Sequence, residues 1–211
     1  MAATELTLYA TPISVYCCKL RLALALKGLR LPEVAPPGGY GSEAYRQIVP
    51  QGTIPALVQG GFVLAETDAI IEYLDEIGTG QLLMPQDPRA RARSRALSRF
   101  IDMRLEPAVR ALFPLVGAGT PVPDPIRAGL LGQIETLERL AGDGPHLAGE
   151  RPGLPDCGLW AVAIVLEAVG YVANQQQSPE TLLGMKLFFV LGPGLLVLLE
   201  GAGEERHEPE A

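Results

Sequence analysis

The feature that most constrains the fold is a change of pattern near residue 78. Before it, strand-like runs alternate with helical ones in the order strand, helix, strand, helical turn, strand, strand, helix. After it, almost every run is helical in composition. The 211 residues are therefore predicted to form a small mixed α/β domain followed by an all-helical domain.

Turn and cap residues place the elements expected within the first domain, residues 1–77. Strands are expected at 5–10, at 29–35 on an edge because of Pro32, and in a hairpin over 53–64. Helices are expected at Val15–Lys27, in a turn or two over 42–49, and over 68–77 after a cap at Thr67. The helix at Val15–Lys27 is apolar on nearly every face; only Lys19, Arg21 and Lys27 interrupt it.

The second half is divided by its prolines and glycines. We expect a linker at 78–88, an all-helical domain at 89–203 and a polar tail at 204–211. The expected helices are a long one opened by Pro88 and kinked at Pro107, then 126–140 and 156–172.

One apolar run, Leu182 to Leu199, is long enough to resemble a membrane span. Lys186 and the Gly192-Pro193-Gly194 break favour two short buried helices instead.

Charge and cysteine content narrow the class of function. A net charge of −7 argues against nucleic acid as the partner, since phosphate binding needs a cationic face. Three cysteines do not form a disulfide scaffold and fit a reducing compartment. The N-terminus lacks the pattern of a secretory signal, so a cytoplasmic protein without a membrane partner is expected.

Pro55, in the segment Gly52-Thr53-Ile54-Pro55-Ala56, lies directly before a predicted strand. A cis peptide at Ile54-Pro55 would leave the N–H and C=O of Ile54 free to pair with a peptide-like ligand. An ordinary trans proline at a strand start is the alternative.

Glu66 and Thr67 stand at the start of a predicted helix. Helix-start N–H groups with a hydroxyl can bind a carboxylate, and Glu66 can accept an ammonium. The pair therefore suits an α-amino acid head group, and a plain N-cap is the alternative.

Ser14 joins the first strand to the first helix. A helix start favours anions, and this hydroxyl could donate a charge-assisted hydrogen bond to a bound thiolate. An N-cap is the alternative for Ser14, and core packing is the alternative for Cys17 and Cys18.

The order of these segments resembles the cytosolic glutathione transferases. The pieces that carry the resemblance are Ser14 before KLRLALALKG (19–28), VPQGTIPAL (49–57), AETDAIIEYLDE (65–76) and, in the helical half, PDCGLWAVA (155–163). It is specific over residues 5 to about 77 and closest to serine-type classes such as zeta, tau and phi.

The resemblance implies a thioredoxin-like N-terminal domain, a helical C-terminal domain and glutathione as co-substrate. Ser14 would stabilise the glutathione thiolate, Ile54 would pair with the cysteinyl backbone, and Pro55 would be the family's cis-proline. Glu66 and Thr67 would hold the γ-glutamyl end. No metal is implied.

Some positions depart from the family's pattern. Thr67 stands where serine is commoner, and Gly153 replaces the Ser or Thr expected three residues before Asp156, so that cap loses its side-chain acceptor. Ser14 replaces the cysteine of omega-type classes, which weakens a thiol-transferase interpretation. Cys17 leaves a residual redox role open.

The predicted reaction is conjugation of glutathione to a small apolar electrophile by a homodimer. The alternatives are a zeta-like glutathione-dependent isomerase or lyase, and a non-catalytic binding module of the same fold. The candidate walls of an electrophile pocket between the domains are Ile13, Met103, Arg104, Ala108 and Phe113. A basic run consists of Arg89, Arg91, Arg93, Arg95 and Arg99. It is either a solvated helix edge, or a dimer contact or a surface that attracts anionic glutathione and substrates.

Overall fold

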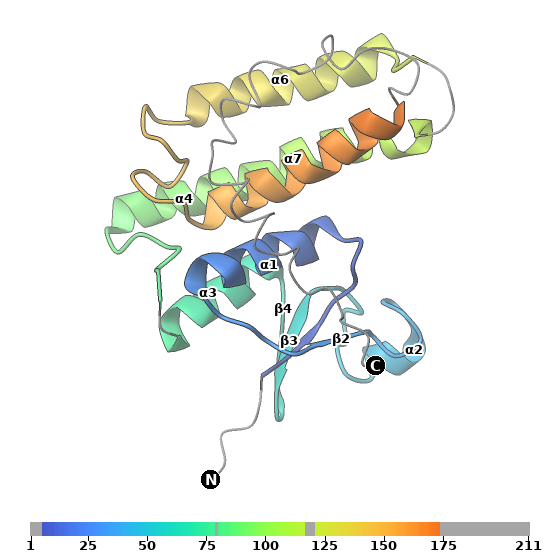
Figure 1. The fold of residues 1–211 in the computed structure, drawn as a ribbon, viewed down its shortest axis with the longest axis vertical. Helices are drawn as coiled ribbons and strands as arrows, with labels where there is room; N and C mark the ends of the chain where they lie inside the picture. Colours follow the sequence, from blue (N-terminus) through green and yellow to red (C-terminus); the bar gives the residue numbers. More distant parts are fainter. Residues whose placement is uncertain (1–5, 79, 117–120, 174–211) are drawn as a thin grey trace, which may run out of the picture.

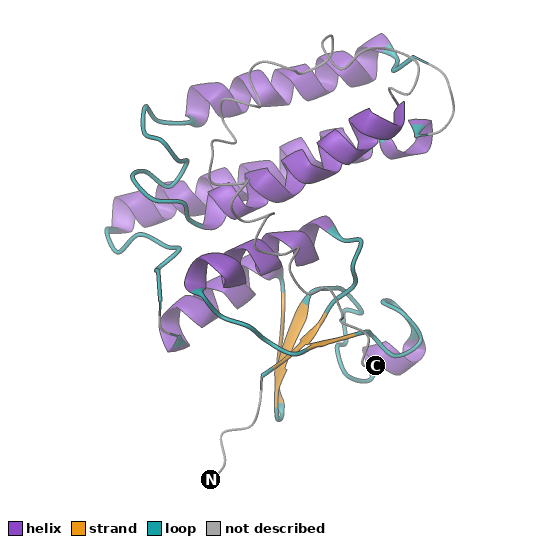
Figure 2. Ribbon diagram, viewed as in Figure 1, coloured by secondary structure: helices purple, strands orange, loops and turns teal. Residues whose placement is uncertain are grey.

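The computed structural model describes residues 6–78, 80–116 and 121–173. Figures 1 and 2 show a small sheet with helices packed beside it and, above two of these helices, a group of long helices. The two kinds of domain predicted from the sequence pattern are confirmed. The apolar run at 182–199 and the tail at 204–211 lie outside the described residues.

The sheet has four short strands in the order β2-β1-β3-β4. Their bounds are β1 Thr7–Tyr9, β2 Glu33–Val34, β3 Ala56–Gln59 and β4 Phe62–Ala65. β2 runs parallel to β1, whereas the other pairs are antiparallel. As Pro32 predicts, β2 is an edge strand.

Side chains alternate between the two faces of the sheet. Leu8 and Leu57 belong to the core under α1 (Val15–Lys27) and α3 (Thr67–Ile77). On the other face, Ala56, the neighbour of Leu57 in β3, and Ala65 of β4 pack with Tyr45 of α2 (Glu43–Arg46). This period of two explains why such short strands cover two apolar layers.

The ends of α1 follow the predicted caps, but the start of α3 does not. Ser14 caps α1, and Gly28 ends it with φ 65°, a conformation that favours glycine. The prediction that Thr67 caps α3 is wrong. Thr67 is the first helical residue and its side chain is buried, while the cap position belongs to Glu66.

The helical domain begins with one long, interrupted helix. Its parts are α4 (Pro88–Phe100), the π-helical segment η1 (Ile101–Leu105), α5 (Glu106–Arg110) and the 3-10 turn η2 (Phe113–Leu115). The kink expected at Pro107 takes the form of η1. Pro107 has no N–H for the Met103 carbonyl, so the regular bonding pattern breaks just before it.

Two further helices complete the described part of this domain. They are α6 (Asp124–Leu140) and α7 (Leu154–Ala173), each starting two residues earlier than predicted. In Figure 1, α4 and α7 lie side by side above α1, with α6 outermost. Leu154, Cys157 and Trp160 of α7 pack into the core of the N-terminal domain, which makes the two domains one packed unit.

The linker is tied down by a buried ion pair. Lys27 Nζ lies 2.6 Å from Asp75 Oδ1 and donates to the Gln81 carbonyl at 3.1 Å. The other Asp75 oxygen accepts the N–H groups of Leu83 and Met84, both at 2.8 Å. The chain between α3 and α4 is therefore fixed against both α1 and α3.

Gly153 at the start of α7 is required by packing. A Cβ there would lie 2.5 Å from the Leu83 carbonyl oxygen and 2.8 Å from the Ala148 Cβ. Asp156 supplies acceptors in its place, since its carboxylate receives the N–H groups of Gly153, Leu147 and Ala148 at 2.8–3.2 Å. The lost cap residue is thus offset by a carboxylate one turn further on.

Most of the basic run on α4 is engaged within the chain. Arg95 pairs with Glu72 at 2.5 Å, Arg91 donates to the Pro85 carbonyl, and Arg93 donates to the Leu140 carbonyl. Across the described ranges, no helix is both long and apolar enough to cross a membrane.

Candidate functional site

Strand register brings the three predicted site segments to one end of the sheet. Tyr9 at the end of β1 pairs with Ala56 at the start of β3, which pairs with Ala65 at the end of β4. The loop that ends at Ser14 begins after Tyr9, the Ile54–Pro55 bond comes just before Ala56, and Glu66 and Thr67 come just after Ala65. Residues far apart in the sequence thus converge where α1 and α3 begin.

Ser14 has a local role that leaves its proton available. Its Oγ accepts the Cys17 N–H at 3.2 Å, as an N-cap does. A hydroxyl that accepts one hydrogen bond can still donate another. The cap and a donor to a bound anion are therefore compatible roles for one side chain.

Ile54 lies between a well-anchored loop and β3. The Ile54–Pro55 peptide is cis. Tyr45 is fully buried and its hydroxyl donates to the Thr53 carbonyl at 2.9 Å, which fixes the backbone just before Ile54. Among the described residues, the N–H and C=O of Ile54 have no hydrogen-bond partner. This short segment can pair with an extended ligand backbone.

Glu66 holds an unusual backbone conformation. Its φ of 73° makes it the one described residue other than glycine with positive φ. Such conformations cost energy and cluster at functional sites. The Glu66 side chain is exposed and makes no capping hydrogen bond to α3, so the cap side chain supplies no acceptor to the first N–H groups of the helix.

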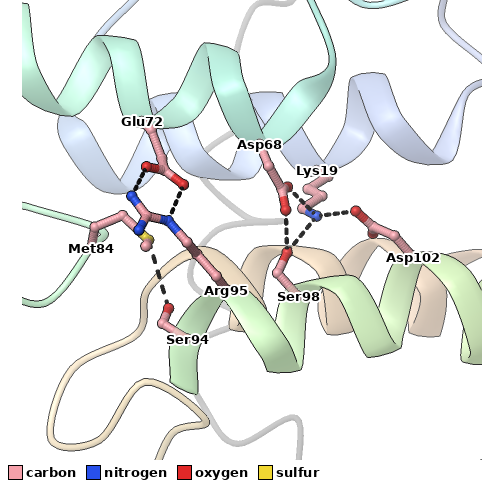
Figure 3. A network of polar contacts seen from close by, with 8 residues as sticks. All are labelled: Lys19, Asp68, Glu72, Met84, Ser94, Arg95, Ser98 and Asp102. Carbon is pink, nitrogen blue, oxygen red and sulfur yellow. Dashed lines mark hydrogen bonds and ion pairs between the residues drawn. The ribbon is translucent and has the colours of Figure 1, made fainter. Parts of the chain in front are cut away.

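Lys19 is a buried cation that the sequence reasoning missed as a site residue. Its Nζ lies 2.6 Å from Asp68 Oδ1 and donates to Ser98 Oγ at 2.9 Å and Asp102 Oδ2 at 2.7 Å. Figure 3 shows these side chains converging from α1, α3, α4 and η1. The available signal was a lysine inside a nearly all-apolar helix, but its partners are distant in sequence.

Tyr16 was also missed. It lies in the first turn of α1 and is half-buried. Burial, together with the nearby carboxylates of Glu106 and Asp102, raises the pKa of its phenol to about 12. The phenol therefore stays protonated at neutral pH, close to Ser14 and to the start of α5.

The five residues predicted for an electrophile pocket are spread over several environments. Ile13 is 97% exposed, Met103 58% and Phe113 38%, and Arg104 is exposed as well. Ala108 packs partly against the core of the helical domain. The Phe113 ring lies 5.5 Å below the Arg110 guanidinium, which is paired with Glu106. None of the five lines the apolar hollow found between η1, α5, α6 and α7.

The cysteines are unpaired and inward-facing. Cys17 and Cys157 are buried and Cys18 is partly so. Burial raises the pKa of the Cys18 and Cys157 thiols, which makes both poor nucleophiles. No group of three or more His, Cys, Asp or Glu side chains suited to a metal ion occurs within the described ranges.

Comparison with known proteins gives a consistent result. Residues 8–81 match the family model for the glutathione S-transferase N-terminal domain. The chain is 33% identical to a glutathione S-transferase of Pseudomonas putida over 72% of this chain and 70% of that protein. It is 34% identical to a maleylacetoacetate isomerase of Pseudomonas aeruginosa, over 71% and 76%. A delta-class glutathione transferase of Nilaparvata lugens has a similar structure, with a TM-score of 0.68, 26% identity, and coverage of 78% and 79%.

Proposed function

This chain belongs to the glutathione S-transferase family and is an enzyme of that type, and from this premise we propose that it joins the glutathione thiolate to a small apolar electrophile. The observation that carries the proposal is the row formed by Tyr9, Ala56 and Ala65. Around this row lie the Ser14 hydroxyl, the Ile54 backbone, which is unpaired among the described residues, and the start of α3.

Ser14 is the proposed thiolate-stabilising residue. A free thiol has a pKa of about 8.5, so only about 3% is ionised at pH 7. Lowering that pKa by about two units needs about 2.7 kcal/mol in favour of the anion. One hydrogen bond to a charged group supplies about 1.5–3 kcal/mol, and a helix start about 0.3–1 kcal/mol. The two together suffice without a metal or a separate base.

Ile54, Glu66 and Thr67 are the proposed anchors of glutathione. The N–H and C=O of Ile54 would pair with the cysteinyl backbone, as an added strand does. The start of α3 and the Thr67 hydroxyl would bind the γ-glutamyl carboxylate, and the exposed Glu66 carboxylate would accept its ammonium.

The electrophile is proposed to bind near Ile13, Met103 and Phe113. Their exposed apolar surface, on the loop before α1 and on η1 and η2, supports an apolar substrate. Arg104 and Ala108 stay candidate walls of the same pocket.

Glutathione-dependent isomerisation is the second candidate, because the chain is 34% identical to a maleylacetoacetate isomerase. An isomerase regenerates glutathione, whereas a transferase consumes it. Free-thiol titration during turnover therefore separates the two reactions.

We also propose a cytosolic homodimer. Phe62, on the edge strand β4, is 44% exposed and packs at 5.2 Å against the Tyr73 ring of α3, which supports an aromatic contact for a second copy. Light scattering at several concentrations measures the assembly.

The test of the reaction compares two N-cap variants, Ser14→Ala and Asp87→Ala. Asp87 caps α4 and accepts the N–H groups of Arg89 and Ala90, so its loss weakens a helix start without touching the site. We expect turnover of a nitroaryl chloride with glutathione to fall about 10²-fold or more in Ser14→Ala alone. Equal activity of the two variants would contradict the proposal and favour a non-catalytic binding module.

A further inference from the structure

We propose that Lys19 and Ser98 are positioning residues for the first turn of α3, so that the helical domain sets the affinity for glutathione without touching it. This inference rests on the proposed function, because it assigns the γ-glutamyl group to that turn.

The contacts form a closed loop between the domains. Lys19 Nζ donates to Ser98 Oγ at 2.9 Å, and the Ser98 hydroxyl donates to Asp68 Oδ2 at 2.7 Å. Asp68 Oδ1 then lies 2.6 Å from Lys19 Nζ. Figure 3 shows Ser98 of α4 in contact with both the lysine of α1 and the carboxylate of α3. Each helix is therefore held in register with the other two.

The Lys19 ammonium has little freedom to move within this junction. Its side chain is 1% exposed, and its Nζ also donates to Asp102 Oδ2 of η1 at 2.7 Å. On the α7 side, a Cβ built at Gly158 would lie 3.4 Å from both Lys19 Cε and Nζ. Five segments of the chain thus meet around one cation.

Asp68 connects the Lys19 contacts to the proposed binding site for the γ-glutamyl group. It is the second residue of α3 and follows Thr67 directly. The Asp68 Oδ1 atom is buried and makes an ion pair but no directed hydrogen bond, so its position depends on Lys19 staying in place. Glu66, on the other side of Thr67, has the strained φ of 73°. A backbone held in such a conformation needs support from its surroundings, and the Lys19 junction supplies it.

The test uses two buried serines one turn apart on α4. Ser98→Ala breaks the loop, whereas Ser94→Ala removes a hydroxyl whose partner is the Met84 sulfur at 3.7 Å (Figure 3). Calorimetric titration with glutathione should show affinity about three- to tenfold weaker in Ser98→Ala and unchanged in Ser94→Ala. The pKa of the bound thiol, followed by ultraviolet absorbance, should be the same in all three proteins, because Ser14 is unaffected.

The outcomes are distinguishable. Tight binding by both variants, or equal weakening in both, overturns the positioning role and leaves the proposed function standing. A wild type that fails to bind glutathione overturns both. Asp68→Asn provides a second variant in case Ser98→Ala unfolds at assay temperature: it keeps the side-chain shape, removes the ion pair, and should weaken glutathione binding by a similar factor.

Discussion

Two lysines on the same helix are buried beside aspartates, yet they are bound in different ways. Lys27 has one carboxylate partner, Asp75, which is 6% exposed and also accepts two linker N–H groups. Lys19 is shared between Asp68 and Asp102, which are 25% and 19% exposed. The Lys27 pair is neutral and sealed, whereas the Lys19 cluster carries one net negative charge within reach of water.

The difference indicates two structural roles: the Lys27 pair fixes the linker, and the Lys19 cluster connects the two domains. The Lys27 pair fixes the linker, so its geometry has no reason to change when a ligand arrives. The Lys19 cluster lies next to Thr67 and joins both domains, so a change there reaches the proposed glutathione site. Both lysines are buried in ion pairs, so burial does not distinguish these roles. The number of carboxylate partners and their exposure to water do distinguish them.

The largest effect is expected from Lys27→Met. It leaves the Asp75 carboxylate buried without its cation, which typically costs about 3–5 kcal/mol of unfolding free energy. Urea denaturation measures the loss. A double variant, Lys27→Met with Asp75→Asn, should recover part of the lost unfolding free energy. A loss below about 1 kcal/mol in the single variant would show that the ion pair does not fix the linker.

Lys19→Met should cost less, about 2 kcal/mol, although it leaves two carboxylates without their cation. Both Asp68 and Asp102 already reach water, so they can be rehydrated once the lysine is gone. The same denaturation experiment ranks the two variants. A loss for Lys19→Met equal to that for Lys27→Met would mean that the exposure of Asp68 and Asp102 does not lower the cost of removing their cation.

The smallest expected effect is a pH dependence centred on Asp102. Burial raises the pKa of its carboxyl, although Lys19 acts in the opposite direction. The folded chain therefore binds this proton more tightly than the unfolded chain, and the stability that the proton contributes is lost as pH rises through the raised pKa. The Asp102→Asn variant has no titrating carboxyl at this position, so it lacks this pH-dependent contribution to stability.

Wild type should therefore lose stability relative to Asp102→Asn as pH rises above the ordinary carboxyl pKa of about 3.9. The slope is bounded by the ~1.4 kcal/mol per pH unit of one whole proton. Denaturation of both proteins across the acid range measures it. A difference independent of pH would mean that Asp102 binds its proton equally in both states.

Local chemistry was enough to predict most of the fold. Caps and breakers such as Ser14, Gly28 and Pro107 act within a turn of their own position, so their consequences can be deduced from the sequence. Thr67 misled because Glu66 adopts positive φ, which shifts the helix start by one residue. The packing reason for Gly153 could not be deduced from the sequence, because its neighbour Leu83 is distant along the chain.

The sequence pointed to candidate site residues that stand in short local motifs, and it missed residues whose surroundings come from distant helices. Short motifs led to the prediction of Ser14, Ile54 and Glu66 as site residues, and their assignment stays a prediction, although the strand register brings their segments together. Lys19 and Tyr16 acquire their surroundings from α4, η1 and α5, whose facing cannot be deduced without the crossing of these helices over α1.

The central claim is that this end of the sheet binds glutathione, and calorimetric titration tests it most directly. Wild type should bind glutathione saturably, and Thr67→Val should bind it more weakly, since the variant loses the hydroxyl at the start of α3. Thr136→Val, which removes a hydroxyl bonded to the Gly132 carbonyl in α6, should bind like wild type. Absence of binding by wild type at millimolar glutathione, or equal binding by Thr67→Val, would contradict the assignment.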